Sequence, residues 1–318
     1  MTMMRSVQTV RSAQAASIFE RRCRCARARW VTLAVCLACG LGPRVWAQET
    51  TQTGPQQLAF IGLRAVANEG QINAVQTDAQ GNLYLLIDQK DGVRLLKTDP
   101  AAANVLAQAQ IGAQGDIGLG MALDPAGNVY VTGPTTSGAL TATSGAAFLR
   151  PSGSSTNSFV AKFDSSLNTV FVTFAGGGLM AANSIAATSD AVFITGGIFA
   201  ATLPVTPAGI IQAPAFGSTQ NGFVEKFSAS GATLLYATYL SGVNGSTTPA
   251  AIAADSSDHA YIAGSTTSAG YPTIAAVVPA MLVSGSVGPV SGFLTKLTPV
   301  GDGITFSTFC LLYTSRCV

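Results

Sequence analysis

The chain has 318 residues, of which 10% are charged and 48% are hydrophobic, and it contains 34 glycines. Sparse charge with abundant small and apolar residues excludes a disordered polyelectrolyte and favours an all-β extracytoplasmic protein. The formal net charge of +2 is uneven, because eight of the 17 basic residues precede residue 48. The rest holds nine basic and 14 acidic residues, a net charge near −5, so nucleic-acid binding is not expected.

The N-terminus has the pattern of a secretory signal peptide. Arginines between Arg21 and Arg29 precede an apolar stretch, Trp30–Gly42, and Val45-Trp46-Ala47 offers small residues at the two positions that a signal peptidase reads. The alternative is a membrane anchor, but a spanning helix needs about 20 apolar residues and this run is shorter. We therefore predict that residues 1–47 are a signal peptide cleaved near Ala47, that the protein is secreted or displayed at the cell surface, and that no membrane span remains. Residues 48–69 are predicted to be a linker with a possible lone strand at Leu58–Leu63.

Few cysteines remain after such cleavage. Four of the six lie in the predicted signal peptide, and the other two, Cys310 and Cys317, lie in the last nine residues. Those nine residues can be back-translated into the transposon end used in sequencing libraries, followed by a stop codon. We therefore expect residues 310–318 to be a sequencing-adapter artefact that interrupts the preceding repeat.

The remaining sequence consists of four imperfect copies of one unit. The second copy is the clearest, because Met121–Asp124 and Val129–Gly133 flank a Gly-Asn turn and predict a β-hairpin. The sequence Phe159–Lys162 starts a second hairpin, and an apolar strand follows nine residues after each equivalent lysine. These lysines recur after 65, 64 and 70 residues, which places the units at about 70–114, 115–178, 179–244 and 245–309.

Each unit thus holds four short strands, and no run shows a sustained helical period. A four-stranded antiparallel sheet repeated at this interval is typical of a β-propeller blade. The sequence therefore predicts an all-β fold, a β-propeller with about four blades of four antiparallel strands each, arranged as an incomplete ring.

The same residues resemble the bacterial seven-bladed beta-propeller repeat (SBBP) family. The resemblance rests on Asp124–Gly133, Phe159–Lys162 and Tyr236–Leu240, with Leu203-Pro204 and Tyr271-Pro272 at the family's aromatic-proline step. It covers roughly residues 70–309. It implies exported propellers of mostly unassigned role and supplies no catalytic residues.

The units depart from this pattern in places. Unit three has Ala187 at the aspartate position and Asp190-Ala191 in place of the Gly-Asn turn, and unit four has Asp258-His259 there. Unit one lacks the long insert between its second and third strands.

Several polar and aromatic residues recur at equivalent positions, and each has a functional and a structural interpretation. Aspartates before the first turn could ring a calcium ion, but calcium takes six to eight oxygens, so we favour carboxylates that cap their own turns. The lysines end apolar strands and are predicted to be solvated strand ends rather than a phosphate site, and the aromatic residues are predicted to pack in the core. These three sets are Asp78, Asp124 and Asp255; Lys97, Lys162, Lys226 and Lys296; and Tyr84, Tyr130, Phe193 and Tyr261.

His259 is the only histidine in the chain and is predicted to be a solvated turn residue. A His-rich metal site is therefore not expected, and neither is a Ser-His-Asp triad, since no Gly-x-Ser-x-Gly motif accompanies it. The sequence indicates no catalytic residue, no cofactor and no metal ligand.

The inserts Pro134–Asn157, Gly197–Asn221 and Ser265–Ser291 are the more informative segments, whereas unit one has only Gln89–Gly92 there. All should emerge at one end of the blades, where propellers often carry function. They hold a single charge, Arg150, and several apolar residues. They could fold back over the blade edges, which we favour slightly, or form an uncharged contact surface. The apolar residues concerned are Phe148, Phe199, Leu203, Phe216, Tyr271 and Met281.

We predict an exported, non-enzymatic module for protein or glycan binding or for cell-surface structure, with its binding residues unknown. One alternative is a polysaccharide lyase or hydrolase that uses carboxylates on the propeller face, but such enzymes need paired carboxyl groups and the acids here stand singly in turns. Another is a spacer that carries a further domain.

Overall fold

The computed structural model describes residues 70–310 except 152–155, 201, 205, 207–211, 213, 215–219, 269 and 278–289. The predicted signal peptide, the linker with Leu58–Leu63 and the tail after Cys310 lie outside the described residues, as do Phe216 and Met281. Within the described ranges, no helix has the length and apolarity of a membrane span.

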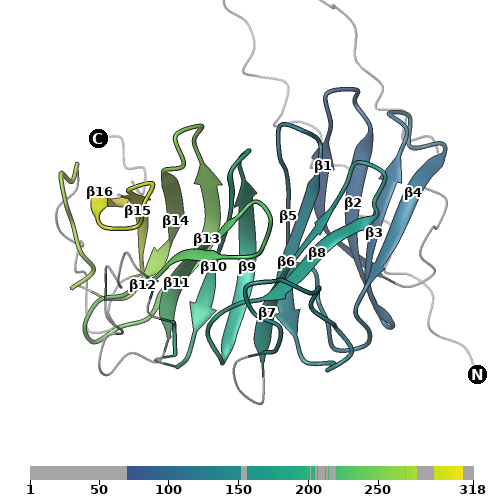
Figure 1. Cartoon of the computed structure of the whole chain (residues 1–318). Helices are drawn as coiled ribbons and strands as arrows, with labels where there is room; N and C mark the ends of the chain where they lie inside the picture. Colours follow the sequence, from purple (N-terminus) through teal and green to yellow (C-terminus); the bar gives the residue numbers. More distant parts are fainter. Residues whose placement is uncertain are drawn as a thin grey trace, which may run out of the picture. The chain divides into compact units, whose positions relative to one another are not determined.

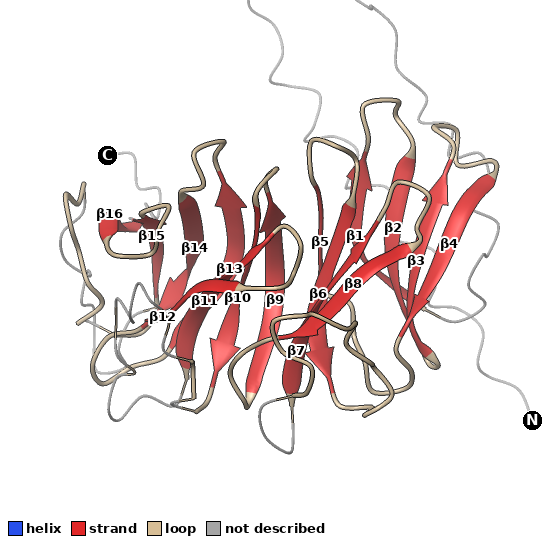
Figure 2. Ribbon diagram, in the orientation of Figure 1, coloured by secondary structure: helices blue, strands red, loops and turns tan. Residues whose placement is uncertain are grey.

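The described residues form four antiparallel sheets of four strands each, and every sheet keeps its strands in chain order (Figure 2). Each sheet is called a blade below, so blade 1 is β1–β4 and blade 4 is β13–β16. The predicted all-β architecture of four-stranded propeller blades is confirmed. The strands are β1 (Gln71–Thr77), β2 (Leu83–Gln89), β3 (Gly92–Thr98), β4 (Val105–Ile111), β5 (Gly120–Leu123), β6 (Val129–Thr135), β7 (Asn157–Phe163), β8 (Thr169–Phe174), β9 (Met180–Ala187), β10 (Ala191–Ile198), β11 (Asn221–Ser228), β12 (Leu234–Leu240), β13 (Thr247–Ala254), β14 (Ala260–Thr266), β15 (Ser291–Leu297) and β16 (Ile304–Cys310).

The first hairpin of each blade forms where the sequence places its turn residues. In blade 2, Leu123 pairs with Val129 across a turn in which Gly127 has φ of 81°, a left-handed conformation that glycine adopts without a Cβ clash. In blade 3, Ala187 pairs with Val192, so the turn is one residue shorter. Thr188, and not Ala187, therefore stands at the aspartate position, which corrects the alignment expected from the sequence.

Each blade packs against the first strand of the blade that follows it. Strand β1 contacts β5; β5, β6 and β7 contact β9; and β9, β10 and β11 contact β13. One apolar cluster between blades 2 and 3 joins Tyr130 and Val160 to Ile194 and Phe223, all fully buried. Figure 1 shows the blades following one another in chain order, from blue β1–β4 to green and yellow β13–β16. All of these strands belong to one compact unit, Leu58–Val318.

The antiparallel order gives every blade two different ends. Turns after the first and third strands lie at one end, the turn end, whereas connections between the second and third strands share the other end with the blade-to-blade linkers. This second end is called the insert end. The long inserts there are residues 136–156, 199–220 and 267–290, while only Lys90 and Asp91 separate β2 from β3. Strand β16 reaches Cys310, the first residue of the predicted tail.

Candidate functional site

At the turn end, each recurring aspartate is occupied by its own hairpin. Asp124 Oδ1 accepts the backbone N–H groups of Ala126 and Asn128, both at 2.9 Å. Its Oδ2 accepts the Asn128 amide at 2.7 Å and the Tyr130 hydroxyl at 3.2 Å. Asp78 in blade 1 makes the same four bonds with Gln80, Asn82 and Tyr84. The turn-capping interpretation is confirmed, because these oxygens are satisfied within the turn.

His259 fills the place of the turn asparagine in blade 4. Its backbone N–H donates to Asp255 Oδ1 at 3.0 Å, and its Nδ1 lies 3.2 Å from the same oxygen. Burial works to raise the pKa of Asp255, but these bonds and the Tyr261 hydroxyl hold it well below its ordinary value. The His259 side chain is 26% exposed, so it is a bonded turn residue rather than a fully solvated one.

The recurring lysines are not solvated strand ends, and that prediction is wrong. Lys162 Nζ lies 4.9 Å above the centre of the Tyr130 ring and 3.9 Å from Asp124 Oδ2, and its side chain is only 13% exposed. Equivalent ring contacts hold Lys97, Lys226 and Lys296. The strand end looked exposed in the sequence because the aromatic ring that covers it comes from the neighbouring strand and the carboxylate from the turn before that strand.

Each of the first three lysines also crosses to the next blade. Lys97 Nζ donates to Ser165 O at 3.0 Å, Lys162 Nζ to Ala229 O at 3.2 Å and Lys226 Nζ to Pro299 O at 2.7 Å. All three carbonyls stand at the same place, in the turn between the third and fourth strands of the following blade. The aspartate, the aromatic ring and the lysine are therefore an inter-blade contact, which we call the lysine latch.

Blade 3 has no aspartate for its latch, and blade 4 supplies one. Asp258 Oδ2 lies 3.1 Å from Lys226 Nζ, and Asp258 Oδ1 accepts the Thr188 hydroxyl at 2.7 Å. The same hydroxyl oxygen accepts the N–H groups of Asp190 and Ala191 and so caps the shortened turn. The charge lost from blade 3 is thus replaced across the interface.

Glu225 is a buried acid that the sequence did not single out. It is 0% exposed in β11, and its two oxygens lie 3.0 and 3.1 Å from the Gly176 N–H in the linker between blades 2 and 3. Burial raises the pKa of Glu225 to about 8, although the N–H groups of Gly176 and Gly177 work in the opposite direction. It is closed off from solvent, so it offers no site for a ligand.

At the insert end, the described parts of the inserts fold back over the fourth strands. The Thr143 N–H bonds the Val172 carbonyl in β8, the Leu203 N–H bonds the Tyr239 hydroxyl of β12, and Ile274 bridges to Ser307 in β16. The side chains of Phe148, Leu203 and Tyr271 pack on the blades, which agrees with the packing interpretation. Phe199 departs from it, because 61% of this residue is exposed.

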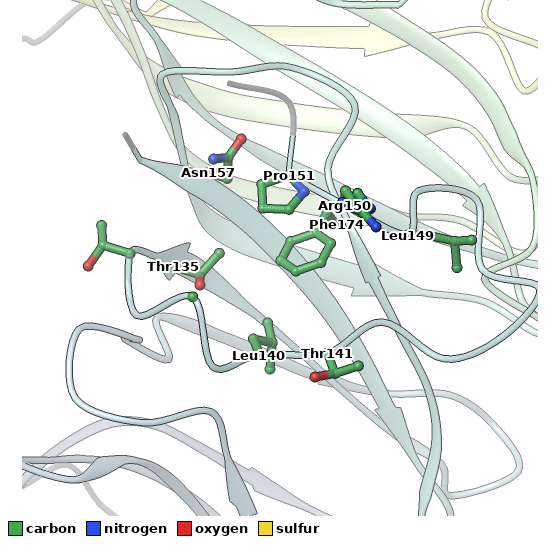
Figure 3. Close-up of a pocket in the computed structure, with 10 residues that line it drawn as sticks. Thr135, Leu140, Thr141, Leu149, Arg150, Pro151, Asn157 and Phe174 are labelled. Atoms are coloured by element: carbon green, nitrogen blue, oxygen red, sulfur yellow. The ribbon is translucent and has the colours of Figure 1, made fainter. Parts of the chain in front are cut away.

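The blade 2 insert also borders an open pocket of about 470 Å³. In Figure 3 the Phe174 ring lies between Pro151 and Arg150 on one side and Leu140 and Thr141 on the other. The described lining combines hydroxyl, amide and guanidinium groups with apolar side chains, and among these described residues there is no acid, histidine, cysteine or lysine. The residues are Thr135, Thr136, Gly138, Leu140, Thr141, Leu149, Arg150, Pro151, Asn157 and Phe174.

Asp116 fixes the polar wall of this pocket from behind. It is 1% exposed and accepts the Thr135 hydroxyl at 2.6 Å and the Ser137 hydroxyl at 2.5 Å, with further bonds from the Ala113 and Ser137 N–H groups. Burial favours the neutral acid, but these donors hold the pKa of Asp116 below its ordinary value. The linker from blade 1 therefore sets the orientation of Thr135.

Asn157 contributes a buried amide oxygen to the pocket. The residue is 3% exposed, yet its Oδ1 has no hydrogen-bond partner among the described residues. Because buried amides are normally paired, this atom marks a place where a ligand or water can bond. Of the lining residues, only Arg150 stands out in the sequence, and no sequence motif indicates Thr135 or Asn157 as part of a site. Within the described ranges, no group of three or more His, Cys, Asp or Glu side chains could hold a metal ion.

The family comparison agrees with this architecture. The sequence model described as "Beta-propeller repeat" (SBBP) matches residues 109–138 and 235–272. No curated protein matches the chain. A solved structure, "Structure of Dos1 propeller", is 10% identical over 78% of this chain and 71% of that one, with a TM-score of 0.30. The two matched segments include the β5–β6 hairpin of blade 2 and the β13–β14 hairpin of blade 4, so the family model identifies SBBP beta-propeller repeats in these two blades.

Proposed function

We propose that this protein is an exported, non-enzymatic propeller module that binds a glycan at its insert end. The observation that carries the proposal is the pocket beneath the blade 2 insert, where hydroxyl, amide and guanidinium groups surround an apolar floor. Concave sites of about 300–1,000 Å³ with a few polar groups on an apolar wall are typical of small-molecule binding. The arginine-rich start, the apolar run and Val45-Trp46-Ala47 support export.

The distribution of carboxylates supports binding over cleavage. Glycoside hydrolysis needs two carboxyl groups that flank the scissile bond. The hairpin aspartates lie at the turn end of the blades and are engaged in their own turns, as Asp124 is with Ala126 and Asn128. Asp116 approaches the pocket, but Thr135, Ser137 and two backbone groups occupy its oxygens. A lyase or hydrolase would have to draw its acids from elsewhere.

An oligosaccharide microarray probed with the full chain tests the proposal. We expect binding that Arg150→Ala weakens at least tenfold. Lys90→Ala should leave it unchanged, because this exposed cation lies at the insert end of blade 1, where there is no long insert. Chromatography of the bound sugars should show no shortened products. Cleavage products would favour the hydrolase alternative, and equal binding by the two variants would remove the pocket from the proposal.

Export has a separate test. The protein recovered from the culture medium or periplasm is expected to begin at Gln48. Recovery of a chain that begins upstream of Trp30 would contradict the predicted signal peptide.

A further inference from the structure

Two hydroxyl donors on the polar wall of the blade 2 pocket are already committed. The Thr135 hydroxyl donates to Asp116 Oδ1 at 2.6 Å, and the Thr136 hydroxyl donates to Gly115 O at 2.8 Å. A hydroxyl has one hydrogen and two lone pairs, so both threonine oxygens remain available only as acceptors. The wall therefore suits a ligand that brings O–H or N–H donors.

Asn157 adds a further unused acceptor. Its Oδ1 has no partner among the described residues, although the residue is 3% exposed at the start of β7. An unpaired buried amide oxygen is unfavourable, and a ligand donor or a bridging water would satisfy it. Thr135, Thr136 and Asn157 thus offer three acceptors to the hydroxyl donors of a sugar ring.

Arg150 adds a cation to the pocket, which calls for an anionic group on the ligand. It is the charged residue of the lining, and it forms no ion pair with any residue that the structure describes. A guanidinium offers two parallel N–H donors that match the two oxygens of a carboxylate. A ligand that satisfies this group carries an anionic acceptor next to its hydroxyl donors.

The apolar part of the pocket fits the remaining surface of such a ligand. Leu140, Leu149, Pro151 and Phe174 line it, and Phe174 is 3% exposed. These side chains can cover the C–H face of a pyranose ring, while the acceptors meet its hydroxyl groups. An extended peptide would present fewer donors to the two threonines.

We propose that the blade 2 pocket recognises an acidic saccharide, a pyranose unit whose carboxylate pairs with Arg150 and whose hydroxyl groups donate to Thr135, Thr136 and Asn157. The proposal rests on the proposed function, since it names the ligand class of the same pocket. The ion pair fixes the orientation of the sugar, and the threonine oxygens, held by Asp116 and Gly115, select hydroxyl donors over further anions.

The test is isothermal titration calorimetry of the full chain with a galacturonic acid trisaccharide and with a galactose trisaccharide of the same linkage. The two sugars differ only at C6, which is a carboxylate in the first and a hydroxymethyl group in the second. We expect the acidic sugar to bind at least tenfold more tightly, with an affinity that falls as salt rises. Arg150→Ala should remove this preference, Arg150→Lys should restore part of it, and Asn157→Ala should weaken both sugars. Lys90→Ala is the matched charge control and should behave as the wild type, and thermal unfolding will show that each variant is folded.

Other outcomes separate the two proposals. Equal affinity for both trisaccharides, lost in Asn157→Ala, overturns the acidic class and leaves the glycan-binding function standing. A preference for the acidic sugar that survives Arg150→Ala also overturns the assignment to this pocket. Absence of binding to either trisaccharide, together with an empty microarray, overturns both proposals.

Discussion

Asp258 stands at a turn position where blades 1 and 2 have glycine. Its φ is 64°, close to the 80° of Gly81 and the 81° of Gly127, so an L-residue occupies a left-handed conformation. That conformation costs roughly 1–2 kcal/mol for a residue with a Cβ. The compensation lies in blade 3, where the carboxylate bonds Thr188 and pairs with Lys226.

We therefore expect Asp258→Gly to destabilise the protein although it relieves the turn. The predicted coupling between Asp258→Gly and Lys226→Met in a double-mutant cycle is about 1–3 kcal/mol, typical of a hydrogen-bonded pair with little solvent access. Urea unfolding measures it. Asp190→Gly is the control, because this exposed aspartate lies in the equivalent turn of blade 3. A coupling free energy of zero would show that Asp258 does not stabilise blade 3 through Lys226.

Glu225 gives the protein a pH dependence with a definite sign. Burial raises its pKa from 4.5 to about 8, so the folded state keeps a proton that the unfolded state has released. The resulting stabilisation is complete below about pH 4.5 and is lost as the pH rises through about 8. Glu225→Gln keeps an acceptor for the Gly176 N–H and removes this titration. Urea unfolding at pH 5, 7 and 9 measures the free energy of unfolding of both proteins. We expect that of the wild type to fall with rising pH relative to that of Glu225→Gln. An equal pH dependence in the two proteins would contradict the raised pKa of Glu225.

Single residues also show where sequence-based prediction stops. The aspartate turns were predictable because Asp78 and Asp124 bond groups two to four residues away, within a recognisable motif. The partner of Lys162 is a backbone carbonyl 67 residues away, and a carbonyl leaves no mark in a sequence. Thr188 was missed for another reason, since a one-residue deletion in its turn shifts the alignment.

Between elements, the lysine latch ties the third strand of one blade to a turn of the next. We expect Lys162→Met to weaken the contact between blades 2 and 3 while it keeps the apolar stem over the Tyr130 ring. Loss of the charged donor leaves Asp124 without its cation, and such losses typically cost about 1–3 kcal/mol. Hydrogen exchange should accelerate at the β11–β12 turn, where Ala229 accepts the bond. Lys90→Met, which removes an exposed lysine, should change neither the free energy of unfolding nor the hydrogen-exchange rate at the β11–β12 turn.

The inserts act as covers for the outer strands, and Tyr271 is the clearest case. Its ring centre lies 4.6 Å from that of Phe293, and its hydroxyl lies 2.8 Å from Thr295 Oγ1. We expect Tyr271→Ala to cost about 3–5 kcal/mol, as for other buried aromatic truncations, and Tyr271→Phe about 1 kcal/mol. Chemical unfolding gives both values. Light scattering should show aggregation for the alanine variant only, because an uncovered strand edge can pair with another chain.

At the scale of the whole molecule, the sequence predicted the number of blades and the strand order in each, since a fixed interval and a period of two suffice for both. It did not predict the pocket. The pocket depends on how one insert lies against β8, and the inserts differ too much in sequence to share a pattern. Blade 1, with two residues between β2 and β3, has no comparable cover.

The interfaces between blades are unequal, and this should decide where the molecule opens first. Blade 1 meets blade 2 mainly through β1 and β5, whereas three strands of blade 2 contact β9 and three strands of blade 3 contact β13. In a repeat protein the stability of a unit is approximately its own term plus the terms of its neighbour interfaces. Blade 1 therefore has the weakest support among the described blades, and its latch residue Lys97 carries a larger share of that support.

We expect native-state hydrogen exchange to be faster in β2 and β3 than in β10 and β11, whose blade is packed on both sides. Lys97→Met should accelerate exchange in blade 1 and leave β14 and β15 unchanged, since the effect passes only to adjacent units. Lys226→Met should do the reverse, with its largest effect in blades 3 and 4. Uniform exchange across all four blades, altered equally by both substitutions, would mean that they unfold as one cooperative unit and that the unequal interfaces do not govern opening.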